Sequence, residues 1–395
     1  MTAKNEYFAI FGGGGIRGIS YCGAYKALIE NDINLTGYAG SSIGAVFASL
    51  IAVGYNYQEA YEILSNTGLE MFIDINIDFK KELAISKGKI FLDWMKDKIE
   101  SKFYRQEYKK DKMPPVKFSD IEKKLIIYSV DLTNLRFLEF SKEKTPDFEI
   151  AKSIRASVSM PGLFTPLELN ETLVVDGDLL KSTPLWRVCD SIKNLSERIL
   201  EFRLEDNETP KKITNSIEYL NRVYNAFCGF STDYIVDMYN EKDKFDYIKI
   251  NTPEVSVVDF LIPKEKRKEL FDIGYNTTNE YLKVTLCKKK SKLLVKYKFL
   301  LEMLKKLQKE LNKKTTLSSY LYLSEIFVYL CEEKKYIDIS LYNKLLDFKN
   351  TYTKNYKQKS FLGIKSTELR GKNELKDSLS KIIKTTKNKI LELEN

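Results

Sequence analysis

The stretch that decides the fold is residues 7–54, with the sequence YFAIFGGGGIRGISYCGAYKALIENDINLTGYAGSSIGAVFASLIAVG. It contains a short apolar segment at 7–11 and a second segment, predicted to be extended, at 38–41. Each runs into a turn and then into a segment with helical spacing, at 17–31 and 43–54. A strand, a turn and a helix that recur in this way are typical of a mostly parallel sheet covered by helices.

Further along the chain, apolar segments at 125–130, 137–141 and 172–175 predict more strands. Residues 70–111 are mixed helical and charged, and predict a surface or lid insertion. Beyond about Glu201 the pattern is mainly helical. We therefore expect an α/β domain followed by a helical part.

Charge is distributed unevenly along the chain. Residues 286–395 contain 26 Lys and Arg against 12 Asp and Glu, a net charge of +14, so the total of +9 leaves −5 for residues 1–285. Two units with different surfaces are implied. We expect a first domain at 5–285 and a basic helical region at 286–395.

The composition excludes several classes of site, because the 395 residues include no histidine. This removes the Ser-His-Asp triad and the HExxH zinc site, and we expect neither a metal nor an organic cofactor. Five scattered cysteines without a CxxC pair indicate a reducing compartment. The longest apolar stretch, 43–54, is far shorter than the roughly 20 residues of a spanning helix, and no signal peptide is visible. We expect a cytoplasmic or peripheral membrane location, with non-classical export left open.

Gly12–Gly18, GGGGIRG, places consecutive glycines before a helix. Such a loop can point several backbone N–H groups at an anion or a developing oxyanion. A nucleotide cradle or a structural turn is the alternative. A P-loop would need Gly-Lys followed by Ser or Thr, and a dinucleotide loop would need an acid near the position of Ser42.

Gly40–Gly44, GSSIG, matches the GxSxG turn that exposes a nucleophilic serine, here Ser42, between a strand and a helix. Without histidine, the base for this serine must be a carboxylate, lysine or tyrosine. Asp176 ends an apolar strand and precedes Gly177, where a carboxylate of an α/β active site would lie. Taken alone, Asp-Gly after a strand is more often an ordinary turn.

The glycine loop, GSSIG, the segment Ser157–Pro161 (SVSMP) and Asp176-Gly177 follow one another in the order found in patatin-like phospholipases. Over about residues 7–200 the chain resembles this family, whose members use a Ser-Asp dyad. The resemblance implies a three-layer α/β fold with helices on both faces of the sheet, joined here to a mainly α-helical C-terminal region. It also implies roles for the motif residues: Ser42 as nucleophile, Asp176 as base, Gly13, Gly14 and Gly15 as oxyanion hole, Arg17 as a candidate phosphate ligand, and Gly18, Gly40, Gly44 and Gly177 as motif glycines.

One departure from the family is Asp178, because glycine or alanine usually follows the Asp-Gly pair. A second carboxylate at this position is expected to raise the pKa of Asp176.

The resemblance implies a phospholipase A-type hydrolase acting on phospholipid or another acyl-ester lipid, at a peripheral and anionic membrane surface, with a protein activator as a further candidate partner. An acyltransferase, a carboxylesterase and a catalytically lapsed binding module remain alternatives. We expect no nucleic-acid partner, because the basic segment has a single arginine, Arg370.

An apolar stripe runs through the basic region, and it consists of Leu293, Tyr297, Leu300, Leu304, Leu307 and Leu311. Lysines flank it, so this helix could lie on an anionic membrane. Packing inside a helical domain is the favoured alternative for a stripe of this spacing.

Overall fold

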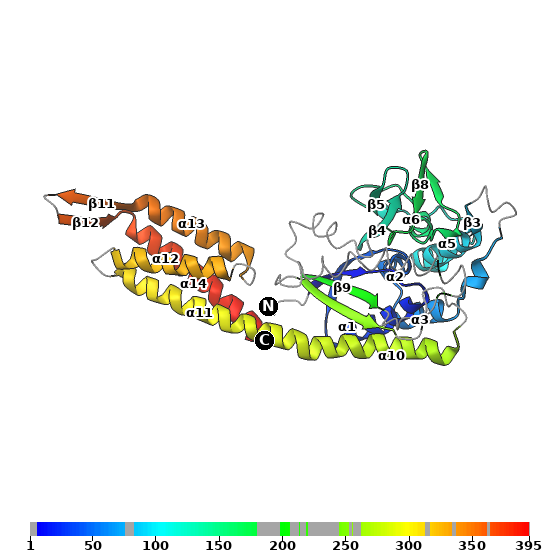
Figure 1. Cartoon of the computed structure of the whole chain (residues 1–395), viewed down its shortest axis with the longest axis horizontal. Coiled ribbons are helices and arrows are strands. Elements are labelled where there is room, and N and C mark those ends of the chain that lie inside the picture. The colour runs from blue at the N-terminus through cyan, green and yellow to red at the C-terminus, as the bar shows by residue number, and fades with distance from the viewer. Residues whose placement is uncertain are drawn as a thin grey trace. The chain divides into compact units, whose positions relative to one another are not determined.

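The structure is a computed structural model, and it describes residues 6–75, 83–179, 198–205, 213, 219, 245–252, 255, 262–312, 317–333, 337–361 and 364–394. The chain forms two compact units (Figure 1). The first consists of Lys4–Asn240 and Lys244–Leu282, and the second mainly of Lys283–Asn395. The boundary falls within a π-helical turn, Tyr281–Thr285.

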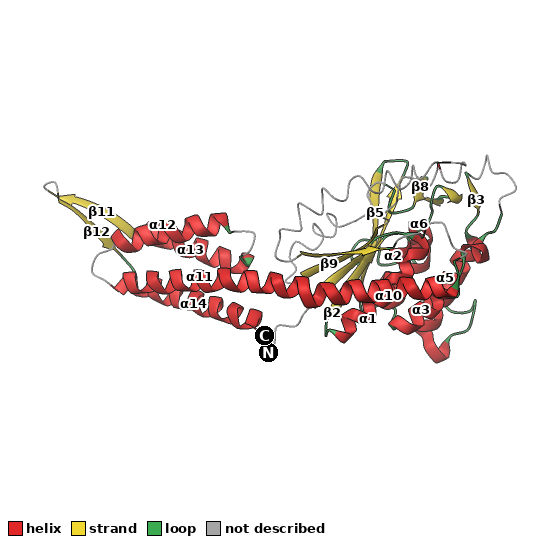
Figure 2. Ribbon diagram, turned by 60° about the horizontal axis from the view of Figure 1, so that its bottom comes forward, coloured by secondary structure: helices red, strands yellow, loops and turns green. Residues whose placement is uncertain are grey.

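An eight-stranded mixed sheet organises the first unit (Figure 2). Its order is β10-β9-β1-β2-β4-β8-β7, and β5 pairs with β4. The pairings from β10 to β4 are parallel, whereas those of β5, β8 and β7 are antiparallel. The strands are β1 (Glu6–Phe11), β2 (Asn34–Gly40), β4 (Lys124–Asp131), β5 (Arg136–Ser141), β7 (Leu167–Leu169), β8 (Thr172–Val175), β9 (Arg198–Glu205) and β10 (Phe245–Asn251).

Helices pack against this sheet and against one another. Helix α2 packs against β1, β2 and β4, which explains why nearly all of its side chains are buried. Helix α6 contacts β4 and β8, and α1 packs against α10 and α3. The helices and short elements are η1 (Gly15–Ile19), α1 (Ser20–Glu30), α2 (Ile43–Ala52), α3 (Tyr57–Ser65), η2 (Leu69–Phe72), β3 (Ala84–Ser86), α5 (Lys89–Tyr104), η3 (Arg105–Glu107), η4 (Phe118–Asp120), α6 (Ile150–Ser157), β6 (Gly162–Phe164) and α10 (Lys264–Glu280).

The predicted strand and helix pairs at the start of the chain are confirmed, as are the strands expected near 125–130, 137–141 and 172–175. The expectation of a mainly helical pattern beyond Glu201 is wrong for β9 and β10, which extend the sheet next to β1. Charged residues interrupt the apolar pattern of these strands, and ion pairs between the strands compensate for them. Arg198 Nη2 donates to Asp246 Oδ2 at 2.7 Å.

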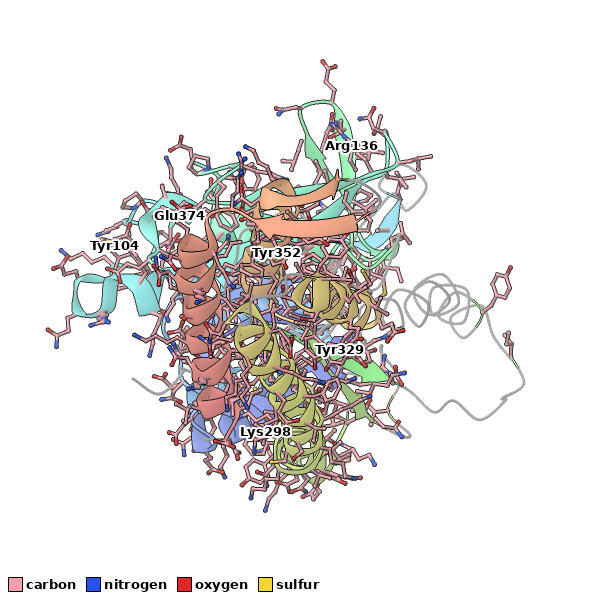
Figure 3. All side chains as sticks on the ribbon, turned by 90° about the vertical axis from the view of Figure 1, so that its left-hand side faces the viewer. Tyr104, Arg136, Lys298, Tyr329, Tyr352 and Glu374 are labelled. Carbon is pink, nitrogen blue, oxygen red and sulfur yellow. The ribbon has the colours of Figure 1, made fainter. Side chains whose placement is uncertain are left out.

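The second unit is a set of helices around its own core, with side chains from all four helices visible in Figure 3. Its elements are α11 (Leu286–Asn312), α12 (Leu317–Glu332), α13 (Ile339–Asn355), β11 (Tyr356–Phe361), β12 (Ile364–Leu369) and α14 (Lys372–Glu394). Every residue of the predicted apolar stripe on α11 is at most 3% exposed. The stripe therefore packs inside the unit, and the arrangement with its leucines in a membrane is wrong. Among the described helices, none has both the length and the apolar character required to cross a bilayer.

Candidate active site

Ser42 occupies the sharp corner between β2 and α2. Its backbone is strained, with φ 49° and ψ −126°. The corner closes so tightly that a Cβ at Gly40 would lie 2.3 Å from the Gly44 carbonyl oxygen, and one at Gly44 would lie 2.1 Å from the Phe11 carbonyl oxygen. Side chains at these two positions would force the strand and the helix apart. The GxSxG pattern thus has the geometry of a nucleophile elbow.

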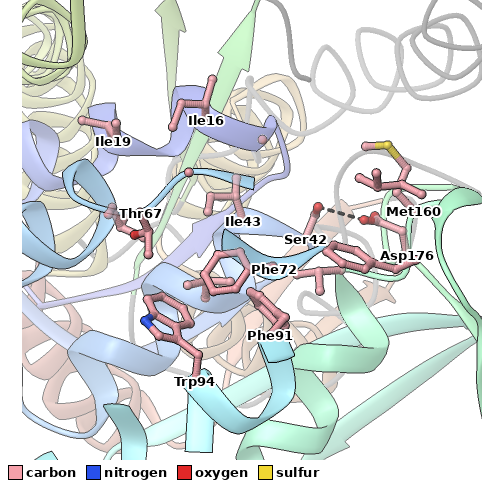
Figure 4. Close-up of a pocket in the computed structure, with 17 residues that line it drawn as sticks. Ile16, Ile19, Ser42, Ile43, Thr67, Phe72, Phe91, Trp94, Met160 and Asp176 are labelled. Atoms are coloured by element: carbon pink, nitrogen blue, oxygen red, sulfur yellow. Dashed lines mark hydrogen bonds between the residues drawn. The ribbon is translucent and has the colours of Figure 1, made fainter. Parts of the chain in front are cut away.

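Ser42 and Asp176 lie within hydrogen-bonding distance, although 134 residues separate them in the chain. The Ser42 hydroxyl donates to Asp176 Oδ2 at 2.8 Å (Figure 4). Asp176 directly follows β8 and is fully buried. Its Oδ1 accepts the Asp178 N–H at 2.9 Å, and its own N–H donates to the Ser159 carbonyl at 3.0 Å. These bonds orient one carboxylate oxygen toward the serine, the arrangement that a general base requires.

Ser157 fixes the backbone of the elbow, which the sequence did not indicate beyond its place in the SVSMP segment. The Ser42 N–H donates to Ser157 Oγ at 2.9 Å. The Ser157 hydroxyl in turn donates to the Tyr128 carbonyl of β4 at 2.6 Å. Ser42 is therefore tied to both α6 and the central sheet.

The glycine loop lies beside the dyad, and its residues have different surroundings. The Tyr21 hydroxyl donates to the Gly12 carbonyl at 2.7 Å and holds the start of the loop. The Gly13 N–H hydrogen-bonds the Asp178 carboxyl group, and a Cβ at Gly13 would lie 1.4 Å from Asp178 Oδ2. Gly15 lines the same pocket as Ser42. The Gly13 N–H is thus directed to Asp178, and its place in an oxyanion hole stays a prediction.

Asp178 is a second carboxyl group in the site and is only 4% exposed. It accepts a hydrogen bond from the Ser41 hydroxyl. Burial, and next the adjacent Asp176 carboxylate, raise the pKa of Asp178 well above its usual range, although Ser41, Arg203 and the Gly13 N–H oppose this shift. The expected coupling between the two acids is present, and it raises the pKa of Asp178.

Arg17 is 6% exposed, and its Nε donates to the Gly14 carbonyl at 3.2 Å. The long side chain therefore packs beside the glycine loop. Such a position favours bracing of the loop over binding of a phosphate from solvent.

Ser42 and Asp176 line a largely apolar pocket (Figure 4). Its free space, including the mouth, is about 750 Å³. Besides Ser42 and Asp176, the residues that line the pocket include Ile43, Thr67, Phe72, Phe91, Trp94 and Phe164. Three of these come from the region predicted as a lid insertion. Phe72 contacts Phe91 and Trp94, with ring centroids 5.2 and 4.9 Å away.

Arg155 of α6 supports the pocket from behind and is only 3% exposed. Its guanidinium donates to the carbonyl groups of Lys87, Gly88 and Thr165 at 2.7–3.0 Å, and to Ser159 Oγ at 2.6 Å. Burial lowers the pKa of Arg155 to about 10. The arginine thereby joins α6 to the start of α5, and the sequence gives no signal for this role.

Comparisons with known proteins identify a family that part of the chain matches. Residues 9–188 match the family model of the patatin-like phospholipases. The chain is 26% identical to the protein YqhO of Bacillus subtilis over 300 residues, which cover 69% of this chain and 97% of YqhO. It is 24% identical to the probable lipid hydrolase 463L of Invertebrate iridescent virus 6 over 189 residues, 47% of this chain and 64% of that protein.

Among solved structures, the crystal structure of VipD from Legionella pneumophila has a similar fold, with a TM-score of 0.50 and 19% identity. The match covers 99% of this chain and 90% of VipD. The elbow, the glycine loop and Asp176 all lie within residues 9–188, the part of the chain that matches the patatin-like phospholipases.

Proposed function

We propose that the protein is a lipid acyl hydrolase of the phospholipase A type, and that its first unit, predicted at 5–285, is the catalytic domain. Asp176 takes the proton of Ser42 while Oγ attacks the ester carbonyl. The protonated Asp176 then gives this proton to the leaving alcohol, and an acyl-enzyme remains. Asp176 next takes a proton from a water molecule whose oxygen attacks the acyl carbonyl, and it returns this proton to Ser42 Oγ as the acyl bond to Oγ breaks and the fatty acid leaves.

The N–H groups of Gly14 and Gly15 stabilise the oxyanion in this proposal. Gly15 lines the pocket beside Ser42, which supports its role. Gly13 contributes indirectly, because its N–H is directed to Asp178.

The observation that carries the proposal is the 2.8 Å hydrogen bond between Ser42 and a buried carboxylate, both in the lining of an apolar pocket. An apolar pocket suits an acyl chain, and a serine beside a base suits attack on its ester. The name of the viral relative, a probable lipid hydrolase, is consistent with this chemistry.

Mass analysis of lipids after incubation with mixed phospholipid vesicles tests the proposal. The wild type should release free fatty acid with water as the only acceptor, and Ser42→Ala should release none above background. Acyl groups that appear on an added alcohol, with no free fatty acid, would favour the acyltransferase alternative. The absence of any acyl cleavage by the wild type would contradict the proposal.

A further inference from the structure

Two hollows in the first unit share a wall. The first is the apolar pocket that contains Ser42, and the second is lined by residues of α3 and α5 that include Glu59, Glu62 and Lys98. Within the described residues, Thr67 and Trp94 line both hollows. The second, outer hollow has charged side chains in its lining, whereas the lining of the first, inner pocket is largely apolar.

Trp94 lies at the end of the inner pocket that is remote from the dyad. Figure 4 shows Ser42 and Asp176 on one side of the pocket, and Thr67 and Trp94 on the other. An acyl chain whose carbonyl carbon lies at Ser42 Oγ would therefore extend toward the indole ring.

The indole is held firmly in this position. Its ring contacts Phe72 with centroids 4.9 Å apart, and Phe91 with centroids 5.9 Å apart. Phe91 continues the wall to Phe164, with centroids 6.0 Å apart, and the Arg155 guanidinium lies over the Phe164 ring at 5.3 Å. A wall that is packed and supported in this way does not move aside at low cost.

On these contacts, we propose that Trp94, with Thr67, closes the far end of the acyl pocket and sets the longest acyl chain that fits. This inference rests on the proposed function. A chain that ends before Trp94 buries all its methylene groups, whereas a longer chain must bend or displace the indole. Removal of the indole would join the two hollows and let a longer chain pass between α3 and α5.

The test uses the full chain and a series of p-nitrophenyl esters from butyrate through octanoate to palmitate. Trp94→Ala should raise the ratio of kcat/KM for palmitate to kcat/KM for octanoate by about tenfold or more, since a few methylene groups in an apolar site change rates by this factor. Cleavage of butyrate is the reference for each variant, and the ratio of kcat/KM for palmitate to that for butyrate should also rise in Trp94→Ala, because a short chain does not reach Trp94. Trp94→Phe should shift the ratio less, because a smaller ring still fills part of the wall.

Met71→Ala is the matched control, because Met71 lines the outer hollow without lining the acyl pocket and is 51% exposed. It should leave the chain-length profile unchanged. If Trp94→Ala does not fold, Trp94→Leu must show the shift instead. An unchanged ratio in a folded, active Trp94→Ala or Trp94→Leu variant would overturn the role of Trp94 and leave the proposed hydrolase intact, whereas a wild type that cleaves no ester would contradict the proposed function itself.

Discussion

At the scale of single residues, the pKa of Asp178 depends on the polar and charged groups around its carboxyl group. The carboxyl group faces Ser41, the Gly13 N–H and Asp176, and the charges of Arg203, Arg17 and Glu201 act on the same buried region. Burial and the adjacent carboxylate raise its pKa, so the folded protein keeps a proton on Asp178 at pH values where the unfolded chain has lost it. Above about pH 3.9, the usual pKa of an aspartate, the free energy of folding therefore includes the cost of binding this proton.

Asp178→Asn should accordingly stabilise the protein at neutral pH. The stability that Asp178 contributes is fully present below the unfolded pKa and is lost as the pH rises toward the folded pKa, whereas asparagine has no such loss. The difference in Tm between variant and wild type should therefore grow between pH 4 and pH 7. Thermal unfolding across this range measures it, with the exposed Asp93→Asn as control. A difference that does not change with pH would contradict the raised pKa of Asp178.

At the scale of the elements, the hydroxyl group of Ser157 connects the end of α6 to its neighbours. Ser157 accepts the Ser42 N–H and donates to the Tyr128 carbonyl. Ser157→Ala would leave both backbone groups without this partner in a buried place. We expect a loss of about 1–3 kcal/mol in the free energy of unfolding, because an unmade buried hydrogen bond costs this much. The value of kcat should fall as well, because the elbow is no longer fixed.

Ser153→Ala provides the matched control for this prediction. Ser153 is also fully buried on α6, but its hydroxyl donates only to the Ile150 carbonyl of the same helix among the bonds described. Denaturant unfolding measures the free energy of unfolding of both variants. Ester hydrolysis should show a normal kcat for Ser153→Ala. Equal kcat values for the two variants would show that Ser157 does not position the nucleophile.

The local pattern of apolar residues in the sequence predicts those elements that are buried along their whole length. Helix α2 is buried on all sides and strand β1 is buried along its length, so their apolar sequences identify them. Strand β9 carries charges that are compensated by a neighbouring strand, and no local pattern shows this pairing. The same limit applies to the site. Ser42 and Asp176 lie in short motifs, whereas Trp94 and Arg155 acquire their roles only when α5 and α6 pack around the pocket.

At the scale of the whole molecule, many lysines of α11 lie on the surface, because the apolar stripe of this helix is buried. Residues 286–395 carry a net charge of +14, and Lys305 and Lys309 are exposed on α11. Reversal of both charges, in Lys305→Glu/Lys309→Glu, should weaken binding to anionic vesicles by about tenfold or more, since each lysine near such a surface contributes about 1 kcal/mol. Vesicle co-sedimentation measures this, and added salt should diminish the difference.

The control for this variant carries the same change of charge in the first unit. Lys264 and Lys268 are exposed on α10, so Lys264→Glu/Lys268→Glu matches it in number and spacing. This variant should bind vesicles much as the wild type does. If both variants lose binding equally, net charge rather than the basic second unit determines attraction to the membrane.

The dyad is the central claim, and initial rates on a soluble short-chain ester test it most directly. Ser42→Ala and Asp176→Asn should each lower kcat by roughly 10⁴-fold or more, and the double variant should be little worse, because the two groups act as one unit. Ser41→Ala should keep most of the activity, because its hydroxyl bonds Asp178 and not Asp176. Near-normal turnover in Asp176→Asn, or in Ser42→Ala, would contradict the account.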